Sequence, residues 1–170
     1  MSKVSQFKRG QFFAAPLLGG GYGYGYFTSV DVPLMKLVNA YDRLGQTPDI
    51  PDDIETAPLI VESLPIGGSE FTLSPKRAAE DGERWILSDR ILADPPLPQK
   101  RFFIQGRNTR PVVIDVLGEQ ADRPATPAEL NELPTYGSDF PPTTTNTIEV
   151  ALRRIDIDPD DFYPEDFPRQ

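Results

Sequence analysis

The sequence predicts an α+β fold: a curved, mainly antiparallel β-sheet, barrel-like in shape, with two or three short flanking helices and long proline-rich loops. Short segments rich in aromatic and β-branched residues recur along the chain, and turn residues separate them, which predicts about five to seven strands. Prolines number 19 among 170 residues, about twice the usual share. Because proline ends helices and removes a strand donor, these prolines favour short elements and stiff connections.

The composition excludes several classes of site. The chain has no histidine and no cysteine, so triads based on histidine, thiolate zinc sites and imidazole metal sites are absent. We therefore expect no cofactor and no metal. The lack of cysteine is compatible with a reducing compartment, and we expect a cytoplasmic protein.

The charge of the chain narrows the class of partner. The formal net charge is −9, and the acidic excess falls after residue 47. This charge repels phosphate backbones and anionic lipid headgroups, so we expect neither nucleic acid nor a membrane as partner. No apolar run approaches the length of about 20 residues that a spanning helix needs. The basic start and the apolar run from Phe12 to Leu18 resemble a signal peptide, but Pro16 interrupts the run, and we interpret it as a strand.

The N-terminal region predicts a β-hairpin. Residues 11–18 and 22–30 have strand character, and three successive glycines form the turn between them. In the second strand, tyrosines at period two share one face, and the glycines between them share the other face. These residues are Tyr22, Tyr24, Tyr26, Gly23 and Gly25. Another part of the protein must therefore approach the glycine face closely.

The segment after the hairpin is ambiguous. The apolar residues from Leu34 to Leu44 fit the spacing of an amphipathic helix, so periodicity alone predicts a helix. Pro33 and the β-branched and aromatic neighbours also suit a strand. Residues 45–58 contain three prolines and four carboxylates, and we expect an acidic loop with one helical turn.

The rest of the chain predicts four more strands and three short helices. The strands cover residues 59–64, 85–88, 101–105 and 112–117. Ser74 and Pro75 predict a helix that ends at Gly82. A capping box from Thr126 to Glu129 starts a second helix, and Asn146 with Glu149 starts a third, which ends near residue 154. We expect a single domain over residues 1–154 and an acidic, aromatic tail over 155–170.

Two motifs resemble known sites but lack residues that those sites require. The turn glycines lack the spacing of a phosphate-binding loop. The alternating carboxylates after residue 154 resemble a calcium loop, but Asp161 and Phe167 occupy the positions of the required glycine and glutamate. Trp85 is expected as a core anchor. Catalysis by a carboxylate pair stays chemically possible, although acids at strand ends usually face water. The candidate catalytic acids are Glu62, Glu70, Asp89 and Asp115.

Two acidic segments are candidate partner-binding surfaces. The first choice is the tail, because aromatic residues interleaved with carboxylates are typical of interfaces; a solvated terminus is the alternative. Its candidate residues are Asp156, Asp158, Asp160, Asp161, Phe162, Tyr163, Glu165 and Asp166. The second is the acidic loop. Its candidate residues are Asp49, Asp52, Asp53 and Glu55.

A series of short motifs in a fixed order resembles a known family. The series begins with Lys8-Arg9-Gly10-Gln11-Phe12-Phe13-Ala14-Ala15-Pro16-Leu17, the glycine turn and Tyr24-Gly25-Tyr26. It continues with Ala40-Tyr41-Asp42, the apolar segment 59–61, the segment 82–86 with Trp85, Pro98 before Phe102-Phe103, Ala125-Thr126-Pro127 with Glu129, and Ile148-Glu149 through Leu152. Over most of residues 8–154, the chain is similar to the immunity protein 26 family of bacterial polymorphic toxin systems. The proline-rich loops and the acidic tail depart from the family pattern.

The resemblance implies a non-enzymatic protein that binds and neutralises a cognate toxin, and it implies a strand rather than a helix over residues 34–42. The acidic surface and the scarcity of catalytic side chains agree with that function. We expect the partner to be a basic effector of nuclease type, whose active site the protein would occlude. The alternatives are a carboxylate-dependent hydrolase and a structural or adaptor component of a secretion or phage assembly.

Overall fold

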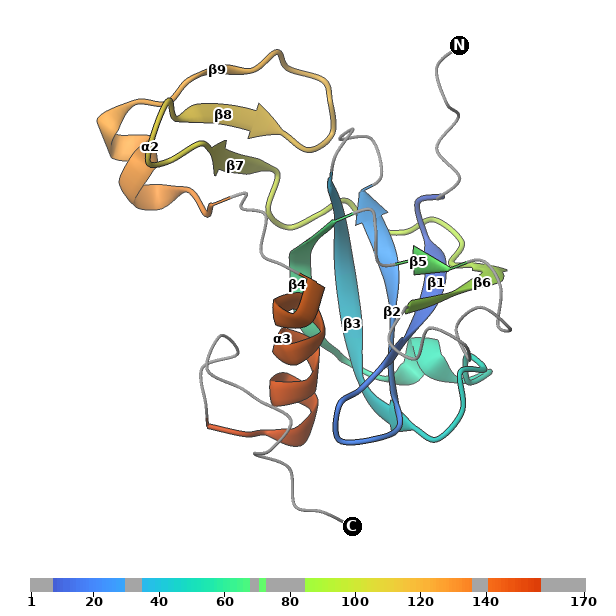
Figure 1. Cartoon of the computed structure of the whole chain (residues 1–170). Helices are drawn as coiled ribbons and strands as arrows, with labels where there is room; N and C mark the ends of the chain where they lie inside the picture. Colours follow the sequence, from blue (N-terminus) through green and yellow to red (C-terminus); the bar gives the residue numbers. More distant parts are fainter. Residues whose placement is uncertain (1–7, 30–34, 68–70, 73–84, 136–140, 157–170) are drawn as a thin grey trace.

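A computed structural model describes residues 8–29, 35–67, 71–72, 85–135 and 141–156 (Figure 1). Over these residues the predicted α+β class is confirmed, because the strands are mainly antiparallel and two short helices accompany them. The strands form two sheets, one of six strands and one of three. The main sheet is not closed, so the expectation of a barrel-like shape holds only loosely.

The main sheet has the strand order β4-β3-β2-β1-β6-β5. All neighbouring pairs are antiparallel except β5 and β6, which are parallel. Its strands are β1 (Gln11–Pro16), β2 (Tyr22–Ser29), β3 (Met35–Gly45), β4 (Leu59–Gly67), β5 (Phe71–Thr72) and β6 (Trp85–Ile91). The 3-10 helix η1 (Ile54–Thr56) lies in the loop between β3 and β4. It confirms the prediction of one helical turn within the acidic loop.

The predicted hairpin and its two unlike faces are confirmed. β1 pairs with β2, and Tyr24 and Tyr26 pack in one apolar cluster with Phe12. The glycine face is approached closely, as expected: a Cβ atom on Gly23 would lie 3.0 Å from Leu152 Cδ1. The glycine therefore leaves room for a helix to pack against β2.

The segment that periodicity alone predicted as a helix is strand β3, so the helix prediction was wrong. β3 lies between β2 and β4 and buries side chains on both faces, Val38 and Ala40 on one and Tyr41 on the other. Its pairing with β4 is also irregular near Ala40. A strand that is buried on both faces loses the simple alternation of apolar and polar residues, and its apolar spacing can then coincide with that of a helix. The strand implied by the family resemblance is confirmed.

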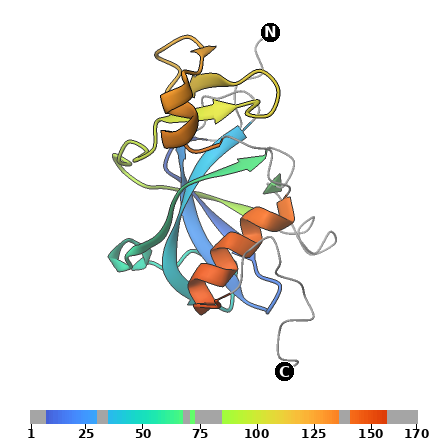
Figure 2. The same cartoon turned by 90° about the vertical axis from the view of Figure 1, so that its left-hand side faces the viewer.

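The helix α3 (Pro141–Arg153) covers one face of the main sheet (Figure 2). Ile148 and Leu152 pack there with Phe13 and Trp85, and the Trp85 indole donates a hydrogen bond to Thr145 Oγ1 at 3.0 Å. Trp85 is fully buried, so its expected role as a core anchor is confirmed. The predicted start of this helix at residue 146 was wrong, because α3 already begins at Pro141. Glu149 lies inside the helix and binds the amides of Leu18 and Gly19 instead.

The three-stranded sheet lies at one end of the main sheet (Figures 1 and 2). It contains β7 (Phe102–Gln105), β8 (Val112–Asp115) and β9 (Arg123–Pro124), and the helix α2 (Pro127–Glu132) follows it. The predicted capping box of α2 is confirmed, with Thr126 and Glu129 as its two members. Leu37 of β3 packs with Phe103 and Ile114, so an apolar cluster joins the two sheets. The helix predicted over 74–82 lies outside the described residues.

Candidate functional site: an anchored acidic loop

The second predicted surface, the acidic loop, is a defined structure between β3 and β4. Asp49, Asp52, Asp53 and Glu55 are all exposed, whereas Ile54 in their midst is fully buried. Ile54 packs with the aromatic cluster of the main sheet that contains Phe12 and Tyr41. Because the apolar side chain between the carboxylates points into the core, the acidic side chains are directed to solvent.

Hydrogen bonds of the backbone shape the loop around that anchor. The Ile54 amide donates to Pro51 O at 3.1 Å, the Thr56 amide to Asp53 O at 2.9 Å and the Ala57 amide to Ile54 O at 3.0 Å. Near its start, the Tyr24 hydroxyl donates to Thr47 O at 2.6 Å. These contacts tie the loop to itself and to β2 without using any of the four acidic side chains.

Arg90 of β6 holds the loop from the side. Its guanidinium donates to Pro51 O at 2.9 Å and to Asp52 O at 3.3 Å, and it lies 5.0 Å from the centre of the Phe12 ring. Its distance to the Glu55 carboxylate is 3.8 Å, at the outer limit of an ion pair. Arg90 therefore binds mainly the backbone of the loop and leaves the carboxylates open to solvent.

The loop keeps a net negative charge. The guanidinium of Arg43 also lies close, 3.6 Å from Asp53, and the Arg43 side chain is 45% exposed. Exposed pairs of this kind are weak, so they neutralise the four carboxylates only in part. Under the loop, burial, with smaller contributions from the neighbouring Tyr26 and Glu55, raises the pKa of the Tyr41 phenol to about 12. The phenol therefore stays neutral beneath the acidic surface.

The first predicted surface, the tail, is described only at its start. Asp156 is exposed, and Asp158 and the later candidate residues lie outside the described residues. Just before the tail, the Arg154 guanidinium donates to both carboxylate oxygens of Asp42, at 2.7 and 3.3 Å. This pair lowers the pKa of Asp42 and joins the end of α3 to β3.

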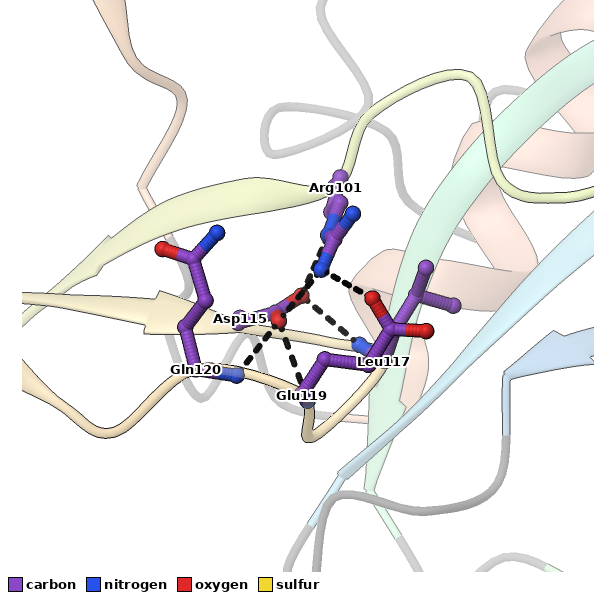
Figure 3. A network of polar contacts seen from close by, with 5 residues as sticks. All are labelled: Arg101, Asp115, Leu117, Glu119 and Gln120. Carbon is purple, nitrogen blue, oxygen red and sulfur yellow. Dashed lines mark hydrogen bonds and ion pairs between the residues drawn. The ribbon is translucent and has the colours of Figure 1, made fainter.

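The candidate catalytic acids do not form a pair among the described residues. Glu62 and Asp89 are exposed, and Glu70 lies outside the described residues. Asp115 is buried, but it accepts five hydrogen bonds: two from Arg101 and three from backbone amides of the turn after β8 (Figure 3). The Arg101 hydrogen bonds hold the pKa of Asp115 well below its ordinary value. The carboxylate therefore closes the turn and is committed to structural contacts.

A second buried carboxylate, Glu149 of α3, holds the β1–β2 turn. It accepts hydrogen bonds from the amides of Leu18 and Gly19, both at 2.8 Å, and from Arg153 at 3.0 Å. The amides of the glycine turn thus bind a carboxylate of the protein itself. Sequence reasoning missed this role; the spacing of Glu149 and Arg153, four residues apart on one helix face, was the available signal.

Comparisons with known proteins identify no relative: no protein-family model, no curated protein and no solved structure matches the chain. Within the part of the chain that the structure describes, no three acidic side chains gather where they could hold a metal ion. None of the helices among the described residues is long and apolar enough to span a membrane.

Proposed function

We propose that this chain is a non-enzymatic, cytoplasmic immunity protein that binds and neutralises a cognate bacterial toxin. The observation that carries the proposal is the acidic loop, in which four exposed carboxylates stand on a backbone held by Ile54 and Arg90. The resemblance to the immunity protein 26 family supports the same class of function.

The proposed mechanism is occlusion of a basic active site. A toxin that cleaves nucleic acid needs a cationic surface for phosphates, and an acidic loop can occupy that surface. The net charge of −9 would accelerate association by electrostatic steering. A loop that is already ordered loses less conformational entropy on binding, so the complex would also dissociate slowly.

The tail provides the other proposed arm of the interface. Its aromatic residues Phe162, Tyr163 and Phe167 are interspersed with carboxylates, and this combination supplies both anchors and charge at interfaces. Reversing Asp158, Asp160 and Asp161 to lysine is expected to slow association more than it accelerates release. Association kinetics at low salt test this; an unchanged association rate would remove the tail from the interface.

The test of the function begins with the partner. The tagged chain is used to capture proteins from its native host, mass spectrometry identifies a stoichiometric partner, and that partner is then purified. The chain should abolish the toxicity of the partner when both are expressed in a sensitive cell. Measured by surface plasmon resonance, the association rate of the purified pair should fall as the salt concentration rises.

A matched pair of triple variants assigns the surface. Reversal of Asp52, Asp53 and Glu55 to lysine should reduce association at least about tenfold and abolish protection of the cell. The control reverses Glu62, Asp122 and Glu132, which are exposed outside the loop and change the net charge equally. Equal loss in both variants would show general charge steering without a specific loop contact. Protection without any complex would contradict the proposed function.

A further inference from the structure

Tyr41 of β3 carries a hydroxyl that the fold of this protein does not use. The Tyr41 side chain is 5% exposed, and its ring stacks on that of Phe12 with the ring centres 6.4 Å apart. The ring also belongs to the apolar cluster that contains Ile54, the anchor of the acidic loop. Tyr41 therefore lies directly beneath the acidic loop.

The other two buried tyrosines of this cluster differ from Tyr41, because each of their hydroxyls has a partner. The Tyr24 hydroxyl donates to Thr47 O at 2.6 Å, and the Tyr26 hydroxyl accepts a hydrogen bond from Asn39 at 3.0 Å. Within the described residues, the Tyr41 hydroxyl makes no hydrogen bond. Hydroxyls of buried tyrosines are normally bonded, so this one is a candidate contact for a group from outside the chain.

The Tyr41 oxygen still touches solvent. Among the described residues, Thr28 Oγ1 is the one side-chain oxygen or nitrogen that is both fully buried and without a partner. The unbonded Tyr41 oxygen is therefore not fully buried. Glu55 raises the pKa of the Tyr41 phenol and Arg90 lowers it, so both charged groups lie near this oxygen. Their side chains are 49% and 33% exposed, which places the hydroxyl where the acidic loop meets solvent.

The surroundings of the hydroxyl favour a cation. Within the part of the chain that the structure describes, the Glu55 carboxylate accepts no hydrogen bond, and Arg90 is 3.8 Å away from it. The Arg90 guanidinium binds two backbone carbonyls of the loop instead. The four carboxylates of the loop, with Arg90 and Arg43 beside them, leave a formal charge of −2. A carboxylate and a phenol oxygen that both lack a donor suit a guanidinium, which has five N–H donors and no acceptor.

We propose that Glu55 and Tyr41 form a binding site for an arginine side chain of the partner, whose guanidinium donates to the Glu55 carboxylate and to the Tyr41 hydroxyl. A protein that binds nucleic acid uses arginines to contact phosphates, so such a side chain is present on the surface to be occluded. The inference rests on the proposed function for the identity of the partner. It adds that Tyr41 determines which cation the acidic loop retains.

The first experiment does not need the partner. The full chain is labelled with ¹³C at the tyrosine Cζ position and titrated with the peptide acetyl-Gly-Arg-Gly-Arg-Gly-amide, followed by NMR. The Tyr41 signal is identified by its absence from Tyr41→Phe. It should shift with this peptide and shift less with the same peptide carrying lysine in place of arginine, because an ammonium is more strongly hydrated and lacks the planar fork of donors. An unmoved Tyr41 signal, or equal shifts with both peptides, would overturn the proposal.

The second experiment uses the captured partner and two variants of the full chain. Tyr41→Phe should raise the dissociation rate at least about tenfold and leave the association rate within about twofold, because a short-range hydrogen bond acts after the encounter that charge steers. Its thermal midpoint should equal that of the wild type, since the hydroxyl has no partner within the described residues. Tyr22→Phe is the matched control, because Tyr22 packs at the margin of the same cluster, and it should dissociate like the wild type.

The arginine site and the proposed function fail in different ways. If the partner binds but Tyr41→Phe dissociates at the wild-type rate, the arginine site is wrong and the proposed function stands. A thermal midpoint lowered by Tyr41→Phe would show a structural role of the hydroxyl and would also overturn the site. If no complex forms with any partner, the proposed function is wrong, and the peptide titration decides the arginine site by itself.

Discussion

Two regions of this protein place an arginine beside acidic residues, and they use it in opposite ways. In the turn after β8, Arg101 binds the carboxylate of Asp115, and three backbone amides complete the shell around it (Figure 3). In the acidic loop, Arg90 binds backbone carbonyls and leaves the carboxylates in water. The arginine that binds the carboxylate fixes that acid in the structure, whereas the arginine that binds the backbone leaves the acids of the loop exposed to solvent.

The largest expected effect is on the Asp115 side of this comparison. Asp115→Asn should lower the free energy of unfolding by about 3 kcal/mol, because it removes the charge from a buried carboxylate that accepts two hydrogen bonds from Arg101 and three from backbone amides. Urea denaturation at neutral pH measures this loss. The control is Glu119→Gln, since Glu119 binds the same guanidinium but is 66% exposed, and it should cost less than about 1 kcal/mol. Equal costs would contradict the structural role of Asp115.

The same pair predicts a pH dependence. Arg101 lowers the pKa of Asp115 in the folded state, whereas an unfolded aspartate titrates near pH 4. The stabilisation is therefore complete above about pH 4 and decreases as the pH falls further, toward the folded-state pKa. The stability difference between the wild type and Asp115→Asn should narrow below about pH 4. Urea unfolding from pH 7 to acid measures it, and a constant difference would contradict the ionic origin.

A smaller effect is expected when the arginine of the loop is removed. Arg90→Met should cost about 1 to 2 kcal/mol, because two hydrogen bonds and the contact with the Phe12 ring are lost. Hydrogen exchange should accelerate most at the amides of Ile54 and Ala57. Arg43→Met serves as the control, since Arg43 contacts only a carboxylate in the described loop, at 3.6 Å. Uniform acceleration across the sheet would show that Arg90 does not act locally.

The smallest effect on stability is expected from the acidic side chains themselves. Neutralising Asp52, Asp53 and Glu55 together, to Asn, Asn and Gln, should change the free energy of unfolding by less than about 1 kcal/mol. Asp115→Asn neutralises a single carboxylate in the same way, yet its expected loss of unfolding free energy is larger than that of the triple variant. Urea denaturation measures both. A large loss in the triple variant would mean that the loop carboxylates build structure as Asp115 does.

The acidic loop was predictable only in part. The cluster of prolines and carboxylates between two apolar segments predicted an exposed loop with a helical turn, and η1 confirms it. Its anchoring was not predictable, because Arg90 lies 39 residues from Pro51 in the chain. No local pattern identifies which arginine will reach a given backbone carbonyl.

Buried carboxylates were harder still to interpret. Asp115 was a candidate catalytic acid and Glu149 a candidate helix cap, because each has apolar or helical neighbours in the sequence. In the structure, Asp115 accepts hydrogen bonds from backbone amides of the turn after β8. Glu149 accepts hydrogen bonds from backbone amides of the β1–β2 turn. The two turn amides that Glu149 binds lie 130 and 131 residues away, so its role depends on how α3 packs on the hairpin.

The sequence by itself determined the elements whose causes are local. Turn glycines and alternating tyrosines specify the β1–β2 hairpin, and Thr126 with Glu129 specifies the start of α2. Tertiary structure alone decided that the apolar segment after the hairpin is β3, buried between β2 and β4, and that the acidic loop is anchored through Ile54 and Arg90. The physical reason is the range of the interactions: caps and turns are satisfied within a few residues, whereas burial on two faces and bonds to distant carbonyls exist only once the sheet has formed.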